Sequence, residues 1–177
     1  AAGSTLAYST LIGGSADDVV TSSAPDVSGD LHVTGVTTSA DFPTTADAFD
    51  TTYNCGGFDG WVGKLDAFGS ALDYSTYFGG SGSDISFGIA TRVGSAYLVG
   101  YTDSTDFPRT PAAFDTSFNG GGADSWVAKL VADTDADTVP DEMNDTVLFV
   151  RRAADGQVME LAVSSWLMGL QPTSILI

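Results

Sequence analysis

Basic residues and cysteine are scarce in this sequence. Six Lys and Arg stand against 23 Asp and Glu, which gives a formal net charge of −17, and residues 1–145 hold 21 of the acids. A surface this acidic repels nucleic acid and anionic lipid and attracts cations. Cys55 is the only cysteine, so no internal disulfide forms. The apolar stretch 158–170 contains Glu160 and is too short to span a bilayer. We therefore expect no nucleic-acid partner and no insertion into a membrane.

The residue patterns of common enzyme sites are also missing. There is no Gly-x-Ser-x-Gly elbow, phosphate loop, dinucleotide fingerprint or Cys/His zinc spacing. The only histidine, His32, lies inside an expected strand, where a half-buried structural role is favoured over a general base. A glycosidase-like acid pair stays open, but the acids in question recur and so are expected to cap turns of a repeat. We predict that the chain is not an enzyme. The recurring acids are Asp41 and Asp106, and Asp59 and Asp124.

A unit of about 65 residues occurs twice. When residues 30–65 are placed over residues 95–130, 19 of the 36 positions are identical. A second block, Tyr-Ser-Thr followed by Gly-Gly-Ser, occurs at residues 8–15 and again 66 positions later at residues 74–81. Self-similarity at a fixed period of this size indicates a repeat architecture.

Alternating apolar and polar residues predict β-strands, and helical periodicity is absent. In the first copy the expected strands are 5–12, 19–27, 31–37, 61–65 and 71–78; in the second they are 85–92, 96–101 and 126–131. The fold class is all-β, with antiparallel meanders that place one face of each sheet against a neighbour. Six repeated aromatics are expected to fill the core between sheets rather than to bind an aromatic ligand. They are Phe42, Phe49 and Trp61, with Phe107, Phe114 and Trp126 in the second copy.

The segments YSTYFGGSGSD, LVGYTDSTDFP and AFDTSFNGGGADSWVAKL, with their first-copy versions, resemble the bacterial SBBP repeat, the seven-bladed β-propeller repeat family. The resemblance covers about residues 5–131. It implies propeller blades of four antiparallel strands in secreted or surface proteins, without an assigned catalytic activity. We expect two blade-like four-stranded antiparallel sheets packed together, plus a C-terminal β segment. The expected domains are two repeats, about 5–70 and 71–131, an acidic linker at 132–145 and a C-terminal hairpin and tail at 146–177.

The count of strands predicts an incomplete second sheet. The Tyr-Ser-Thr strand closes a blade in the family pattern, yet it stands here before the first complete blade and has no copy after Leu130. An unpaired edge is a template for another strand. Three segments are candidates to fill it: the chain's own N-terminus, residues 146–152, or the N-terminal strand of a second molecule. The residues of the expected assembly strand are Leu6, Tyr8, Thr10 and Ile12.

Head-to-tail strand donation that does not close into a ring gives a filament. We therefore expect an extracellular or cell-surface structural protein, a fibre subunit whose partners are copies of itself. Few Lys and Arg, together with abundant Gly, Ser, Thr and Asp, are typical of bacterial proteins outside the cytosol. The alternative is a fragment of a larger surface propeller that binds carbohydrate or protein ligands on its loops.

The acidic run DTDADTVPDEMND at residues 133–145 has the spacing of a calcium loop. Alternating short carboxylates supply the six to eight oxygens that calcium takes, and the Val139 carbonyl fits position 7. The run resembles thrombospondin type 3 loops, although Thr138 replaces the usual glycine. A solvated acidic linker is the alternative. Asn144 also begins the only N-x-S/T sequon, a weak glycosylation signal. The expected calcium ligands are Asp133, Asp135, Asp137, Val139, Asp141 and Asn144.

Overall fold

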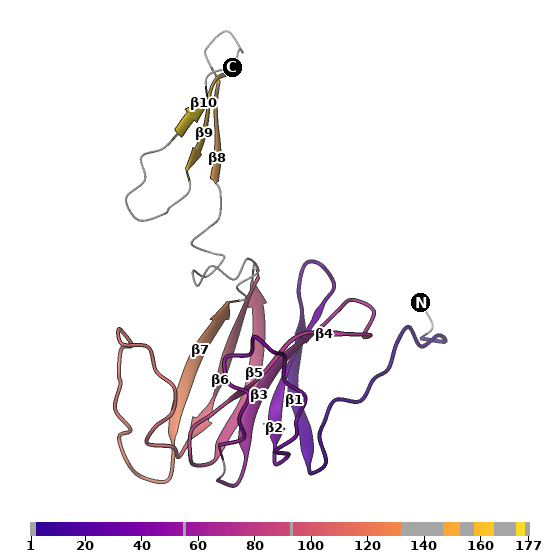
Figure 1. Cartoon of the computed structure of the whole chain (residues 1–177), viewed down its shortest axis with the longest axis vertical. Coiled ribbons are helices and arrows are strands. Elements are labelled where there is room, and N and C mark those ends of the chain that lie inside the picture. Colours follow the sequence, from indigo (N-terminus) through magenta and orange to yellow (C-terminus); the bar gives the residue numbers. More distant parts are fainter. Residues whose placement is uncertain are drawn as a thin grey trace. The chain divides into compact units, whose positions relative to one another are not determined.

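The computed structural model describes residues 3–54, 56–92, 94–131, 147–152, 158–164 and 173–175. The chain divides into two compact units, Ala1–Leu130 and Val131–Ile177, and each is considered by itself. Both are built from strands, and no helix occurs in the described residues (Figure 1). Within those residues no helix is therefore long and apolar enough to cross a membrane. The all-β class predicted from alternating polarity is confirmed.

The first sheet has four antiparallel strands in the order β1-β2-β3-β4. They are β1 (Asp18–Pro25), β2 (Leu31–Thr37), β3 (Asp59–Leu65) and β4 (Leu72–Phe78). Each strand pairs with the next along the chain, so the sheet is a simple meander. The Tyr-Ser-Thr residues 74–76 belong to β4. The first sheet therefore ends at Phe78, beyond residue 70, where the first repeat was expected to end.

The second sheet has three strands in the order β5-β6-β7. They are β5 (Asp84–Arg92), β6 (Ser95–Thr102) and β7 (Asp124–Val131). The expectation of two four-stranded sheets is therefore right for the first sheet and wrong for the second, which lacks the Tyr-Ser-Thr strand that has no copy after Leu130. The prediction of a strand over residues 5–12 is wrong for the chain by itself, because residues 3–17 lie in no strand of the structure. A strand exists only with a partner for its ladder of hydrogen bonds.

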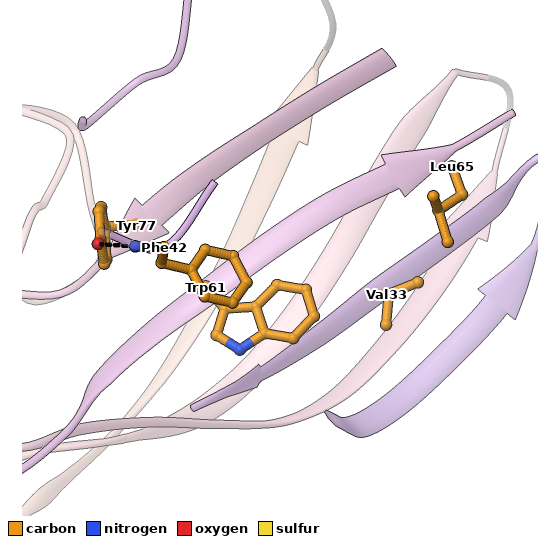
Figure 2. Packing of buried hydrophobic residues seen from close by; sticks show 5 residues of the cluster. All are labelled: Val33, Phe42, Trp61, Leu65 and Tyr77. Atoms are coloured by element: carbon orange, nitrogen blue, oxygen red, sulfur yellow. Dashed lines mark hydrogen bonds between the residues drawn. The ribbon is translucent and has the colours of Figure 1, made fainter. Parts of the chain in front are cut away.

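Two clusters of buried apolar side chains hold this unit together. The first centres on Trp61 of β3, with Phe42 packed 4.7 Å away between ring centroids and Tyr77 of β4 beside them (Figure 2). Figure 2 also shows the hydrogen bond at 3.1 Å that the Phe42 N–H donates to the Tyr77 hydroxyl. The long loop after β2 is thereby fastened to the core by its single buried aromatic ring.

The second cluster fills the space between the two sheets. Phe78 and Val62 come from the first sheet, Trp126 comes from β7 of the second, and Phe107 comes from the loop after β6. The Phe78 ring lies 5.4 Å from Phe107 and 5.3 Å from Trp126. Trp126 and Phe107 are the counterparts of Trp61 and Phe42, so both copies use the same pair of rings as their core.

The other repeated aromatics do not lie in the core. Phe49 is 61 % exposed and Phe114 is fully exposed. The prediction that they fill the space between sheets is wrong. They stand farther along the loops after β2 and β6 than Phe42 and Phe107, which alone of the repeated loop aromatics reach the core. Phe49 still touches Phe78, at 5.9 Å between ring centroids.

In the unit Val131–Ile177, β8 (Val147–Arg152), β9 (Val158–Ser164) and β10 (Thr173–Ile175) form a separate antiparallel sheet in the order β10-β9-β8. The first two are the strands expected on either side of the Asp155-Gly156 turn, which itself lies outside the described residues. Residues 147–152, part of the segment considered as a filler of the second sheet, are paired with β9 as β8. β10 was not expected from the sequence.

Candidate functional site

The loop that leads from the first sheet into the second is fastened by side-chain hydrogen bonds. Asp106 Oδ1 accepts from the backbone N–H and from the hydroxyl of Ser81, at 2.9 and 3.0 Å. Asp84 Oδ2 accepts from the Gly80 N–H at 2.7 Å and from Ser104 Oγ at 2.8 Å. We call this set of contacts around residues 79–84 the latch. It explains why Asp106 recurs, because this acid holds the connection between sheets.

The same latch occurs before the first sheet. Asp41 Oδ1 accepts from the backbone N–H and the hydroxyl of Ser15, at 2.8 and 2.9 Å. Asp18 Oδ2 accepts from the Gly14 N–H at 2.8 Å and from Ser39 Oγ at 3.0 Å. In both copies the hydrogen bonds from serine lower the pKa of the anchoring acid, Asp41 or Asp106, below its usual value. Residues 13–18 therefore enter the first sheet as residues 79–84 enter the second.

The segment before this first latch lies where a preceding sheet would have its last strand. Ile12 packs on the first core cluster, as its counterpart Phe78 packs on the second. Leu6 and Leu11 are exposed, and the Tyr8 ring lies against Gly69, where an added Cβ would be 2.3 Å from it. Figure 1 shows this indigo segment on one side of the unit and β7 on the other. Three of the four predicted assembly residues, Leu6, Tyr8 and Thr10, are thus exposed, and Ile12 is half-buried.

The junction between the two sheets combines apolar packing with buried hydroxyls. The hydroxyls of Thr34 and Ser86 are hydrogen-bonded at 2.8 Å, and both side chains are buried. Thr21 Oγ1 donates to the Ser86 carbonyl at 2.6 Å. Thr91 Oγ1 donates to the Pro25 carbonyl at 2.9 Å and joins the far ends of β5 and β1. These hydroxyl groups at the junction therefore all have hydrogen-bond partners.

The corresponding face of the second sheet is exposed. Val127 is 83 % exposed, whereas its counterpart Val62 is 0 % exposed. Tyr97 and Lys129 lie together on this face, with Nζ 5.7 Å from the ring centroid. We call it the outer face. Its four residues and their buried or half-buried counterparts in the first sheet are Tyr97 and His32, Val99 and Thr34, Val127 and Val62, and Lys129 and Lys64.

Two carboxyl groups are buried at the start of facing strands. Asp59 begins β3 and Asp84 begins β5, and the Asp84 N–H donates to the Phe58 carbonyl at 2.7 Å. Both side chains are 0 % exposed, and the Oδ1 atom of each has no hydrogen-bond partner. Burial, reinforced by the charges of Asp84 and Asp50, raises the pKa of Asp59 to about 7. Asp59 Oδ2 accepts from the Asn54 N–H, and its counterpart Asp124 accepts from Asn119, so both acids do close turns as predicted.

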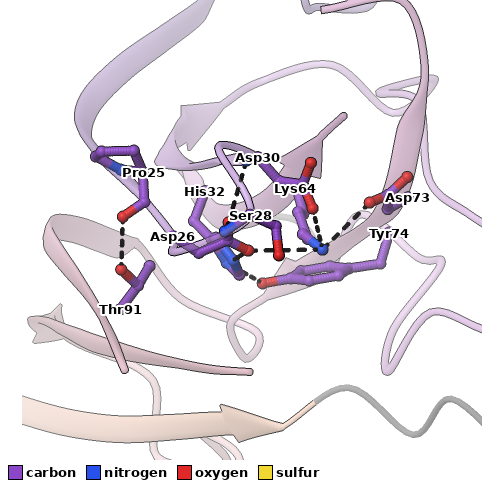
Figure 3. A network of polar contacts seen from close by, with 9 residues as sticks. All are labelled: Pro25, Asp26, Ser28, Asp30, His32, Lys64, Asp73, Tyr74 and Thr91. Atoms are coloured by element: carbon purple, nitrogen blue, oxygen red, sulfur yellow. Dashed lines mark hydrogen bonds and ion pairs between the residues drawn. The ribbon is translucent and has the colours of Figure 1, made fainter. Parts of the chain in front are cut away.

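His32 is buried in a chain of polar contacts (Figure 3). Its Nδ1 lies 3.0 Å from the Tyr74 hydroxyl, and its Nε2 lies 3.4 Å from Asp26 Oδ2. Because a carboxylate only accepts, Nε2 carries the proton and Nδ1 accepts from Tyr74. Burial lowers the pKa of His32 and raises that of Tyr74. A nucleophile requires the opposite shift of its hydroxyl, so the arrangement is suited to holding strands together.

Lys64 completes this network. Its Nζ lies 2.8 Å from Asp30 and 3.3 Å from Asp73, with Asp26 at 3.7 Å (Figure 3). Burial acts to lower the pKa of Lys64, but hydrogen bonds to Asp30 and Asp73 raise it above its usual value. The sequence signal for this network is weak, because the second copy keeps a lysine but replaces His32 by Tyr97.

The predicted calcium ligands Asp133, Asp135, Asp137, Val139, Asp141 and Asn144 lie outside the described residues, as do the Asn144 sequon and Cys55. Within the described part of the chain, no group of three or more His, Cys, Asp or Glu side chains is placed to hold a metal ion.

A β-propeller repeat family, SBBP, matches residues 73–108. The matched residues run from β4 through the latch and β5 and β6 to the Asp-Phe-Pro motif. The match therefore includes the crossing from one sheet to the next. No curated protein matches the chain. The chain is similar to a β-propeller repeat over this stretch, and the all-β sheets agree with that similarity.

Proposed function

We propose that this chain is a non-enzymatic structural protein of the cell exterior that joins copies of itself head to tail by β-strand exchange. The observation that supports this most is a pair of features in one unit: residues 6–12 lie in no strand, and β7 is the last strand of a three-stranded sheet. A row of unpaired backbone groups accepts a further strand readily. In the resulting fibre or surface polymer, residues 6–12 of each copy are the fourth strand of its neighbour's second sheet.

The pairing of β3 with β4 supplies the register. In the first sheet Tyr74 lies opposite Lys64, and Thr76 lies opposite Val62. Residues 6–12 repeat the sequence of β4, and β7 repeats that of β3. The donated strand therefore places Tyr8 opposite Lys129 and Thr10 opposite Val127 of the neighbour.

The position of the two features favours an open chain of copies. The N-terminal segment and β7 lie on opposite sides of the unit (Figure 1). A contact between two different surfaces of the same molecule forms a ring only when the rotation between copies closes, and otherwise it propagates. The extracellular assignment is supported by the acidic, lysine-poor composition.

Removing the donor segment tests the proposal. We expect that the full chain forms concentration-dependent oligomers in light scattering and fibres in electron microscopy, and that deletion of residues 1–11 leaves a folded monomer. The deletion keeps Ile12, which packs on the first core cluster, and the latch at residues 13–18. Thr10→Pro should act like the deletion, because proline removes a ladder N–H, whereas Thr10→Val should assemble normally. Fibres that persist after the deletion rule out donation by this segment.

A second candidate is a section of a surface propeller that binds carbohydrate or protein on its loops. The match to a β-propeller repeat supports it, as do the exposed rings of Phe49 and Phe114 on the long loops. Exposed aromatic rings provide flat apolar area for ligand contact. A full chain that stays monomeric at every accessible concentration favours this second candidate.

A further inference from the structure

The junction between the two sheets is more polar than the two exposed sheet faces that carry Val99 and Val20. Inside the chain, Thr34 of the first sheet meets Ser86 of the second through a buried hydroxyl pair. The counterpart of Thr34 on the outer face is Val99, and the counterpart of Ser86 in β1 is Val20. Both are exposed, at 47 % and 52 %. Each hydroxyl of the inner pair is thus replaced by an exposed valine at the corresponding outer position.

The two valines lie on the surfaces that a repeated junction brings together. Val20 is paired with Gly35, two residues from Val33 of the first core, so it shares the face that lies away from the second sheet. Ser86 is paired with Gly100 in the same way, two residues from Leu98. Val99 alternates with Leu98 and therefore lies on the outer face. The bulge follows directly after Val20 in β1 and after Ser86 in β5, so the match of positions is unambiguous.

We infer that the outer face is a docking surface for a second copy of this chain, in which Val99 of one copy packs against Val20 of the next where Thr34 and Ser86 meet inside the chain. The inference rests on the proposed head-to-tail assembly and names its contact. A valine pair suits an interface that is exposed before it forms, because burial of two methyl-bearing side chains drives association. A hydroxyl facing a valine would be buried without a partner, so the pairing also selects the outer faces for one another.

A double-mutant cycle tests the contact. Val99→Thr and Val20→Ser alone should each weaken self-association, measured by sedimentation, roughly tenfold or more, since each buries an unpaired hydroxyl. The double variant recreates the Thr34–Ser86 pair across the interface and should recover most of the lost affinity. Both residues are exposed in the single chain, so circular dichroism and thermal unfolding should be unchanged in all three variants.

Cross-linking gives an independent readout. In a Cys55→Ser background, Val20→Cys with Val99→Cys should yield a ladder of disulfide-linked oligomers that reductant removes. Val19 is as exposed as Val20 but occupies the alternate face of β1, so Val19→Cys with Val99→Cys is the matched control and should give little product.

The outcomes separate the two proposals. Assembly of the parent chain that ignores both valine substitutions and gives no disulfide ladder overturns the Val20–Val99 contact and leaves strand exchange standing. A parent chain that never assembles overturns both. Weakening by the single variants, recovery in the double variant and the specific ladder together support the contact with a second copy.

Discussion

At the scale of single residues, two carboxyl groups at the starts of strands are buried without a full set of hydrogen bonds. Asp59 and Asp84 are each wholly buried and each keeps one oxygen without a donor. A buried acceptor without a donor costs about 1–3 kcal/mol. A proton on Asp59 removes a buried charge, and burial together with the charges of Asp84 and Asp50 therefore raises its pKa to about 7.

This arrangement predicts a pH dependence of stability. The pKa of Asp59 rises from 3.8 to about 7 on folding. The folded chain therefore holds a proton that the unfolded chain releases between about pH 4 and 7, and the contribution of Asp59 to stability falls as pH rises through that range. Asp59→Asn should abolish this loss. Its free energy of unfolding relative to the parent chain should increase from pH 4 to pH 7 by a few kcal/mol at most and then level off.

The control is Asp124→Asn. Asp124 makes the same turn hydrogen bond with Asn119 but is only half-buried and begins the last strand of its sheet. Comparing the pH profiles of urea unfolding for the two variants separates the effect of full burial of the acid from that of changing a turn acid to an amide. Equal slopes for the parent and for Asp59→Asn would show that Asp59 does not carry the proton.

At the scale of elements, the latch is a connection of fixed geometry that glycine makes possible. A Cβ added at Gly80 would lie 2.6 Å from Asp106 Oδ1 and 2.7 Å from the Ser104 Cβ. At Gly14 the corresponding distances are 2.4 Å to Asp41 Oδ1 and 2.6 Å to the Ser39 Cβ. Both glycines are therefore required by close approach of the anchoring side chains.

The two latches differ in what they support, so the same substitution should have different effects. Gly80→Ala disturbs the connection between two packed sheets and should lower the free energy of unfolding by about 1–3 kcal/mol. Gly14→Ala loosens only the N-terminal segment and should leave global unfolding nearly unchanged. Hydrogen exchange should nevertheless become faster at the Ser15 amide, which Asp41 protects. Equal global destabilisation by the two variants would contradict this division.

Most strands that pair within the chain were predictable from sequence, β10 excepted, whereas residues 5–12 were predicted as a strand and form none in the described structure. Residues 31–37 alternate in polarity and form β2 with the predicted bounds. Residues 5–12 carry the same pattern as β4 but have no neighbouring strand, and pairing depends on a partner that local pattern does not report. Phe49 and Phe114 repeat as strictly as Trp61, yet a repeat records that a residue is required and not that it is buried. Asp41 and Asp106 were expected to cap nearby turns, but the serines that they bind lie 26 and 25 residues away in the sequence.

At the scale of the whole molecule, the net charge of −17 opposes association of copies. Screening reduces this repulsion beyond about 8 Å at physiological salt. Bound divalent cations would reduce it further, and the predicted calcium loop at 133–145 is the segment with suitable spacing. Calcium binding remains a proposal, because these residues lie outside the described structure.

Calorimetry decides the calcium proposal. We expect saturable heat on adding calcium to the full chain after chelator treatment, and its loss when Asp133, Asp135 and Asp137 are changed together to Asn. Magnesium is the ion control, since it prefers a smaller octahedral site and should bind more weakly. Heat no larger than that of dilution would leave residues 133–145 as a solvated linker.

The position of residues 6–12 directly before the anchored residues 13–18 has a mechanical consequence. Residues 13–18 are anchored to the first sheet by hydrogen bonds, while residues 6–12 belong to no strand of it. Sheets that stack face to face place the strands across the axis of a row, so tension along the axis would load the donated strand and the contact between faces together. Each junction between copies would therefore break only when the strand ladder and the face contact separate at once.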